Sequence, residues 1–293
     1  MIIVKLIDGL GNQLFQYAVG RHLAYINKTE LKLDISEFET YKLHAYSLTP
    51  FCVNATIATK DEVARFQKYK RKPGRKWFLY NRLVANPNKY VQEKQFHFDP
   101  DVLSVKGPAY LDGFWQTEKY FKEIEQVIRK EVALKIPPSP LSAELVGKIK
   151  AEKNAVAVHI RRGDYANNPN TLKYHGTCSI EYYMRATKYL ADKIGTPHFF
   201  IFSDDPTWVK ENIKLAFPTT YVDHNKADKN YEDLILMSTC KHNIIANSSF
   251  SWWGAWLNTN PDKIVVAPEK WFNSTKAGTQ THDLIPETWT KMS

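Results

Sequence analysis

The sequence predicts an α/β protein built from two facing Rossmann-like domains with a cleft between them. Apolar, strand-like segments alternate with helical ones in both halves of the 293-residue chain. Such alternation is typical of parallel sheets that are covered on both faces. The segment KIPPSPLS at 135–142 interrupts it, because its prolines can neither continue a helix nor donate to a sheet. We therefore expect a domain boundary in this segment.

The N-terminal half opens with a strand, a tight loop and a helix. Residues 1–7, MIIVKLI, predict a buried strand, and DGLGN at 8–12 predicts the loop. Apolar residues at helical spacing predict a helix over 13–27, and ELKLD at 30–34 predicts a second strand. The pattern becomes more helical over 60–135. These elements form the first predicted domain.

The C-terminal half shows a longer alternation of the same kind. Strands are predicted over 155–160, 198–203, 219–223, 242–246 and 263–268. Helices are predicted over 179–194, 205–213 and 230–240. The expected division of the chain is therefore a domain over 1–135, a domain over 143–275, and a tail over 276–293 that packs back on the N-terminal domain.

The composition describes a folded chain with a basic net charge. A net charge of +9 favours an anionic partner or a phosphorylated substrate. The chain has no run of about 18 apolar residues and no signal-peptide pattern at its start, so we expect a cytoplasmic protein. The basic loop KYKRKPGRK at 68–76 is expected to stay solvated, with peripheral docking on the inner membrane as the alternative. The three cysteines of the chain are widely spaced, which indicates that there is no cysteine-based metal site.

The segment HIRRGDY at 159–165 places Arg161 and Arg162 just beyond a buried strand. Adjacent guanidinium groups can bind a diphosphate bidentately, or they can bind carboxylates such as Asp164. In parallel sheets ligands bind outside the carboxyl ends of the strands, which favours the diphosphate. His159 lies within the strand, where a lone histidine is more often a hydrogen-bonded core residue.

Two further strand ends carry polar residues. NSSFSWWGAWL at 247–257 predicts a helix with Asn247 or Ser248 as N-cap and its tryptophans in the core. The same helix start, with hydroxyls and free N–H groups, also suits a phosphate. In SDDP at 203–206, Asp205 fits an N-cap, while the role of Asp204 stays open.

Two other motifs give weaker evidence of a functional site. DGLGNQ at 8–13 lacks the third glycine of a dinucleotide fingerprint, although its loop suits a close approach to a ligand. DPD at 99–101 matches the D-x-D of metal-dependent sugar transferases, but it is predicted to be a turn.

Taken together, HIRRGDY, DGLGNQLFQYA, NYEDLILMSTC and NSSFSWWGAWL resemble the α-1,2-fucosyltransferase family in its bacterial form, in the family's order. The resemblance implies a GT-B fold and transfer of L-fucose, with inversion, from GDP-fucose to the 2-hydroxyl of a terminal β-galactose. It implies an acceptor-side N-terminal domain, a donor-binding C-terminal domain, and no metal or other cofactor. O-antigen biosynthesis is the implied setting. The alternatives are another linkage, such as α-1,6, and a non-catalytic carbohydrate-binding protein.

The resemblance also implies roles for particular residues. Arg161 and Arg162 would hold the diphosphate and stabilise its departure. Asp164 is the candidate base because it is the nearest carboxylate in the sequence, and the alternative is that it orients the arginines. His159 and Asp233 would read the guanine. The other implied donor-binding residues are Ser248, Ser249, Phe250, Gly11, Asn12 and Gln13.

Two other classes of protein fit the sequence less well. A nucleic-acid-binding module would carry exposed aromatic residues interleaved with lysines, whereas the tryptophans here have helical, buried spacing. A nucleotide-binding oxidoreductase would need the complete glycine fingerprint that DGLGNQ lacks.

Overall fold

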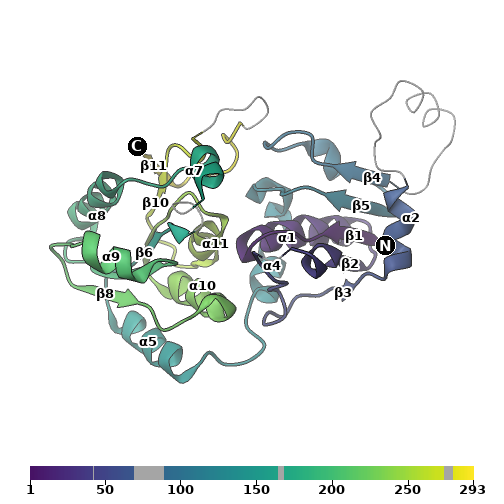
Figure 1. Ribbon diagram of the computed structural model, residues 1–293. Coiled ribbons are helices and arrows are strands. Elements are labelled where there is room, and N and C mark those ends of the chain that lie inside the picture. Colours follow the sequence, from purple (N-terminus) through teal and green to yellow (C-terminus); the bar gives the residue numbers. More distant parts are fainter. Residues whose placement is uncertain (42, 69–88, 164–167, 274–279) are drawn as a thin grey trace. The chain divides into compact units, whose positions relative to one another are not determined.

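The structure, a computed structural model, describes residues 1–41, 43–68, 89–163, 168–273 and 280–293. The chain divides into two compact units (Figure 1). Unit 1 comprises Met1–Ala133 with Gly278–Leu284, and unit 2 comprises Leu134–Ala277 with Ile285–Ser293. The chain passes from the first unit to the second beside the predicted proline-rich segment.

Unit 1 contains a five-stranded parallel sheet. Its strands are β1 (Ile2–Lys5), β2 (Leu31–Asp34), β3 (Thr56–Ile57), β4 (Lys89–Gln92) and β5 (Ala109–Asp112). They lie in the order β3-β2-β1-β5-β4, and neighbouring strands are parallel. The α-helices described are α1 (Leu10–Ile26), α2 (Lys60–Gln67) and α4 (Glu125–Glu131). Short 3-10 turns lie over Ser36–Glu39, Pro100–Val102, Glu118–Tyr120 and Lys122–Ile124.

The core of unit 1 forms around β1 and α1. Ile2, Ile3 and Val4 of β1 are fully buried, which explains why this strand is a continuous apolar run rather than an alternating one. Most of α1 is buried as well, including its polar residues Gln13 and Gln16. Buried amides must find hydrogen-bond partners inside the protein, so this helix organises the loops around it.

Unit 2 contains a six-stranded parallel sheet. Its strands are β6 (Ala155–Ile160), β7 (His198–Ser203), β8 (Thr219–Val222), β9 (His242–Ile244), β10 (Val265–Pro268) and β11 (Thr290–Met292). Its helices are α5 (Pro140–Ala151), α7 (Pro169–His175), α8 (Ile180–Ile194), α9 (Pro206–Asn212), α10 (Asn230–Thr239) and α11 (Ser249–Leu257), with a 3-10 turn over Ala227–Lys229.

The strand order β11-β10-β9-β6-β7-β8 is the order of a dinucleotide-binding Rossmann sheet. From β6 the chain adds β7 and β8 on one side of the sheet, and then β9, β10 and β11 on the other side. The strand order therefore reverses between β6 and β9, which is the topological switch point. Trp252, Trp253 and Trp256 of α11 are at most 2% exposed, which confirms their prediction as core residues.

The α/β class and the two parallel sheets are therefore confirmed, but four strands, β3, β4, β5 and β11, were missed. The more helical pattern expected over 60–135 is confirmed for α2 and α4, but β4 and β5 lie in the same stretch and were not predicted. Each has only four residues, too few to show a strand period against the polar segments around it. The predicted tail is divided, since Gly278–Leu284 belongs to unit 1 whereas β11 extends the sheet of unit 2.

Among the described residues, no helix combines the length and the apolar character that a membrane crossing needs.

Candidate active site

Asp204, at the end of β7, organises the residues that follow β6. The two strands are parallel neighbours, so the segments after them meet at the same edge of the sheet. Arg161 Nη1 lies 2.7 Å from Asp204 Oδ2, and the backbone N–H of Arg162 donates to Asp204 Oδ1 at 2.8 Å. A Cβ atom on Gly163 would lie only 2.4 Å from Asp204 Oδ2. One carboxylate thus positions residues 161–163, and this structural role answers the question that the sequence left open for Asp204.

The guanidinium of Arg162 lies flat on an aromatic ring. Its Cζ atom is 3.5 Å from the centroid of the Trp208 ring, and its Nε is 3.7 Å from Asp205 Oδ2. Asp205 also accepts from the Trp208 N–H at 3.2 Å, so the predicted N-cap is confirmed. Stacking fixes the plane of a guanidinium while its edge keeps the fork geometry that suits phosphate.

His159 and Phe250 meet across the switch point. Their ring centroids are 5.4 Å apart, one ring coming from β6 and the other from the start of α11. His159 is 4% exposed, and its Nδ1 has no hydrogen-bond partner among the described residues. Burial, assisted by the charge of Arg161, lowers the pKa of His159 to about 3, so the imidazole is neutral. The core location expected of His159 is therefore confirmed, whereas the hydrogen bond expected of a core histidine is missing at Nδ1 among the described residues.

The start of α11 has no side-chain cap. Ser248 occupies the N-cap position without a side-chain capping hydrogen bond, and Ser249 is the first helical residue. Asn247 precedes the N-cap position, and its side chain bonds elsewhere: Oδ1 accepts from Cys178 Sγ at 3.6 Å, and Nδ2 donates to the backbone oxygens of His175 and Trp271 at 3.0 and 3.1 Å. The first-turn N–H groups therefore have no capping acceptor from these side chains, which suits an anion.

Asp233 lies in the first turn of α10. Its Oδ1 accepts from Asn225 Nδ2 at 2.7 Å. Burial raises the pKa of Asp233 to about 7, against the lowering effect of the Asn225 hydrogen bond. Its neighbour Glu232 accepts from the Ser139 hydroxyl at 2.6 Å, so the two adjacent carboxylates have different roles.

The loop after β1 in unit 1 is held by Asp8, whose φ of 68° lies in the left-handed region. Its carboxylate accepts from the Gly9 N–H and the Asn12 side chain, and it lies 3.2 Å from His44 Nε2. Burial opposes ionisation of Asp8, but these contacts outweigh it and lower its pKa. Gln116, which follows β5, donates to Asn12 Oδ1 at 2.5 Å. Asn12 therefore links the ends of two neighbouring strands.

Gln13 holds the same loop through hydrogen bonds from inside the core. It is fully buried, and its amide donates to the backbone oxygens of Asp8 and Ala45 at 2.7 and 2.9 Å. The Ser47 N–H donates to its Oε1 at 2.8 Å. Gly11 is buried beside it in the first turn of α1. The side chain of Gln13 thus positions the loop.

A cavity at the carboxyl end of β4 contains a carboxylate that the sequence did not single out. Glu93 follows β4 and accepts from the backbone N–H groups of Phe114 and Trp115 at 2.8 and 2.9 Å. Burial raises the pKa of Glu93 to about 7, although both hydrogen bonds act in the opposite direction. The residue type and the position after a four-residue strand carry no local signal of this burial.

Two of the sequence predictions lie outside the described residues. These are the candidate base Asp164 and residues 69–76 of the basic loop. The DPD motif is the predicted turn, since Asp99 accepts from the Asp101 N–H and caps a 3-10 turn. Within the described ranges, no group of three or more histidine, cysteine, aspartate or glutamate residues is arranged to hold a metal ion.

Unit 2 therefore gathers two arginines, each beside an aspartate, and an uncapped helix start at the carboxyl ends of the neighbouring strands β6 and β9. Positive charge comes from Arg161 and Arg162, and N–H groups come from the start of α11. Beside them lies a neutral pair, His159 and Phe250, whose rings suit a flat ligand. A nucleoside diphosphate has both an anionic part and a flat part.

The whole chain is similar to known bacterial transferases. The family described as "Glycosyl transferase family 11" matches residues 1–292. The "Alpha-1,2-colitosyltransferase" of Escherichia coli is 34% identical, covering 100% of this chain and 99% of that protein. The "O-antigen biosynthesis glycosyltransferase WbnK" of Escherichia coli is 33% identical, covering 96% of this chain and 97% of that protein.

A solved structure shows the same fold. An Arabidopsis thaliana FUT1 variant in complex with GDP aligns with a TM-score of 0.56 at 10% identity, covering 99% of this chain and 75% of that one. The likeness agrees with the predicted GT-B type of α/β fold.

Proposed function

The chain belongs to glycosyl transferase family 11, the α-1,2-fucosyltransferase family, and on that premise we propose that it is a galactoside α-1,2-fucosyltransferase. L-fucose would pass from GDP-β-L-fucose to the 2-hydroxyl of a terminal β-galactose, with inversion and without a metal ion. The observation that carries the proposal is the joint placement of the arginine turn and the open helix start beside the switch point of unit 2.

The diphosphate of the donor would bind at this edge. Arg161 and Arg162 would face its oxygens, and Ser248 and Ser249 would add hydroxyl and backbone donors. As the bond between fucose C1 and the β-phosphate oxygen breaks, the electron pair moves to the phosphate, where negative charge grows. Donors that are already in place stabilise this charge without reorganising, and each is worth about 3 kcal/mol.

The acceptor hydroxyl would attack C1 from the opposite face and lose its proton as the new bond forms. Asp164 stays the candidate base on sequence grounds. Asp204 is less suited to that role, because its carboxylate is already engaged by Arg161 and by the Arg162 backbone.

The guanine would lie near His159, Phe250 and Asp233. A neutral imidazole with an unused ring nitrogen can hydrogen-bond to a base edge without attracting a competing anion. The carboxylate of Asp233 would accept from the N1–H and 2-amino groups of guanine, as the resemblance implies.

This role of Asp233 predicts a pH dependence of GDP binding. Because its pKa is raised to about 7, the carboxylate that accepts from guanine is lost as pH falls below that value. We expect GDP affinity to increase between about pH 6 and about pH 8, and Asp233→Asn to bind GDP roughly tenfold more weakly at the higher pH.

Calorimetry with GDP and with inosine diphosphate checks this prediction. Inosine diphosphate lacks the 2-amino group, so the preference for GDP should shrink in Asp233→Asn. The phosphate of the ligand titrates as well, but it does so equally in both proteins. An unchanged preference and an unchanged pH profile in the variant would exclude guanine recognition by Asp233.

A second sugar-nucleotide donor, GDP-colitose, should be tested directly, because the chain is 34% identical to an α-1,2-colitosyltransferase over its full length. Colitose is L-fucose without the 3-hydroxyl. A site that hydrogen-bonds this hydroxyl rejects the deoxy sugar strongly, whereas a site that merely tolerates it discriminates weakly.

The deciding experiment measures GDP release from GDP-fucose and from GDP-colitose in EDTA, with and without lactose. The proposal predicts galactoside-stimulated release with GDP-fucose and a product with an α-1,2 linkage by NMR. Faster turnover of GDP-colitose would reassign the donor, and another linkage would reassign the regiochemistry. Binding of galactosides without any release would leave a carbohydrate-binding protein, and loss of release in EDTA would contradict a metal-independent reaction.

The acceptor class is supported by one relative. The similarity to a protein named for O-antigen biosynthesis supports a saccharide acceptor of that class. A panel of O-antigen fragments that end in β-galactose, compared with lactose, tests this through the ratio of their kcat/KM values.

A further inference from the structure

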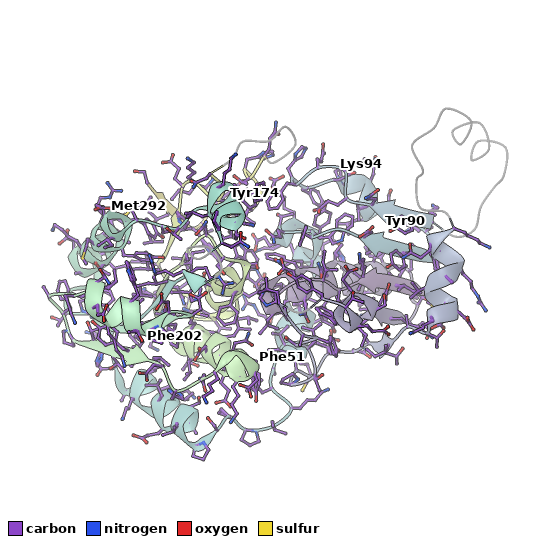
Figure 2. All side chains as sticks on the ribbon, viewed as in Figure 1. Phe51, Tyr90, Lys94, Tyr174, Phe202 and Met292 are labelled. Carbon is purple, nitrogen blue, oxygen red and sulfur yellow. The ribbon has the colours of Figure 1, made fainter. Side chains whose placement is uncertain are left out.

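The cavity in unit 1 has a wall that suits a sugar. It has a volume of about 140 Å³ and lies beyond the end of β4, the strand that carries Tyr90, with Lys94 just after it (Figure 2). Its charged and aromatic lining comes from Glu93, Lys94, Asp99, Asp101, Trp115 and Tyr120, and its other lining residues include Gln92, Gln95 and Val105. A water molecule occupies about 30 Å³, so the cavity has room for the hydroxyl groups and part of the ring of a monosaccharide.

Glu93 can still accept hydrogen bonds into this cavity. Each of its carboxylate oxygens receives one backbone N–H, from Phe114 and from Trp115. A carboxylate oxygen has two lone pairs, so each oxygen keeps one acceptor position. The carboxylate is fixed in place by the same two bonds, which is how a binding group is preorganised.

Trp115 supplies an unused donor at the same place. The residue is 1% exposed, and its indole Nε1 has no hydrogen-bond partner among the described residues. Its backbone has a φ of 58°, which is a strained conformation for a bulky residue. Such strain persists where the surrounding structure enforces it, and it clusters at ligand sites. The bond from the Trp115 N–H to Glu93 is part of that enforcement.

The donor and the acceptor lie beside one glycine. A Cβ atom on Gly113 would lie 2.9 Å from Trp115 Cε2, which is bonded to Nε1, and 3.0 Å from Glu93 Oε2. The indole edge and the carboxylate therefore flank the same point. Only a residue without a side chain lets them approach it together.

The charges of the lining select the class of ligand. Three carboxylates, Glu93, Asp99 and Asp101, face a single lysine, Lys94, so a diphosphate would be repelled. A neutral ligand with several hydroxyl groups is not repelled, and it can use both the carboxylate and the indole N–H.

We propose that this cavity is a subsite for the galactoside acceptor, in which Glu93 accepts from a sugar hydroxyl and the Trp115 indole N–H donates to another. The inference rests on the proposed function for the identity of the sugar. It assigns acceptor binding to particular residues of unit 1, separate from the donor residues of unit 2.

The test compares Glu93→Gln, Trp115→Phe and the cavity-filling Val105→Phe with the wild-type enzyme. Trp115→Phe keeps an aromatic side chain but removes the indole N–H donor, so it tests the cavity independently of Glu93→Gln. Glu123→Gln, an exposed carboxylate in the same unit, is the matched control. Each protein is assayed with GDP-fucose and lactose, and lactose binding without donor is followed by saturation-transfer NMR.

We expect the KM for lactose to rise about tenfold or more in all three cavity variants, because each removes a hydrogen bond or the space itself. The KM for GDP-fucose and the affinity for GDP should stay within twofold of wild type, as they should in Glu123→Gln. Folded variants with an unchanged lactose KM, or with equal losses for donor and acceptor, would overturn the assignment. A wild-type enzyme that transfers no fucose, yet binds lactose in a Glu93-dependent manner, would instead refute the proposed function alone.

Discussion

Replacing Arg162 with alanine is expected to lower GDP release from GDP-fucose by about a hundredfold or more. The guanidinium lies on Trp208 and near Asp205, and the proposal makes it one of the preorganised donors to the departing diphosphate. Removing one such donor costs about 3 kcal/mol in the transition state. The loss should appear mainly in kcat, because the charge on the β-phosphate grows as the bond breaks.

Arg185→Ala is the matched control. Arg185 lies on α8 with an exposed side chain that donates to the backbone oxygen of Ser293, and its removal should leave kcat unchanged. The measurement is a GDP-release assay with lactose, accompanied by thermal melting of each variant. If a folded Arg162→Ala protein released GDP at the wild-type rate, the diphosphate role of this turn would have to be abandoned.

Gly163→Ala is expected to reduce activity by roughly a hundredfold while the protein stays folded. The new methyl group would lie 2.4 Å from Asp204 Oδ2, so the carboxylate must move. That carboxylate holds both Arg161 and the Arg162 backbone. Misplacing a catalytic group by about 1 Å can cost a hundredfold in rate.

A second glycine in the same unit provides the comparison. Gly147 lies in α5, where a Cβ atom would meet nothing within 4 Å, so Gly147→Ala should keep full activity. It should also raise the free energy of unfolding by about 0.5–1 kcal/mol, because alanine is the better helix former. Denaturant melts and GDP-release rates of the two variants, measured side by side, separate crowding at the site from a general effect of alanine. Equal activity in both would show that the position of Asp204 is unimportant.

Part of the candidate site was predictable because it depends on local patterns. The run AVAVHI is apolar on both faces, so a buried parallel strand was the expected structure, and HIRRGDY then had to follow its carboxyl end. The N-cap role of Asp205 and the buried tryptophans of α11 were predictable for the same reason. Each of these depends on a few consecutive residues.

Other parts depended on which strands became neighbours. The pairing of Arg161 with Asp204, rather than with Asp164, requires β6 beside β7, and 42 residues separate the Arg162 N–H from the Asp204 carboxylate that it binds. Gln13 was expected to approach the ligand, but it lies in the core, where the backbone of Asp8, Ala45 and Ser47 occupies its amide. Residue type alone cannot distinguish these outcomes.

The sequence by itself determined the alternation of strands and helices, the division into two parts and the family, because periodicity and short motifs are properties of consecutive residues. Only the tertiary structure decided the strand order, and with it the cavity beside Glu93 and the raised pKa of its carboxyl. A pKa shift arises from burial and from neighbours that are distant in the chain. The four residues of β4 are too few to show a sequence pattern from which the burial of Glu93 or its neighbours could be predicted.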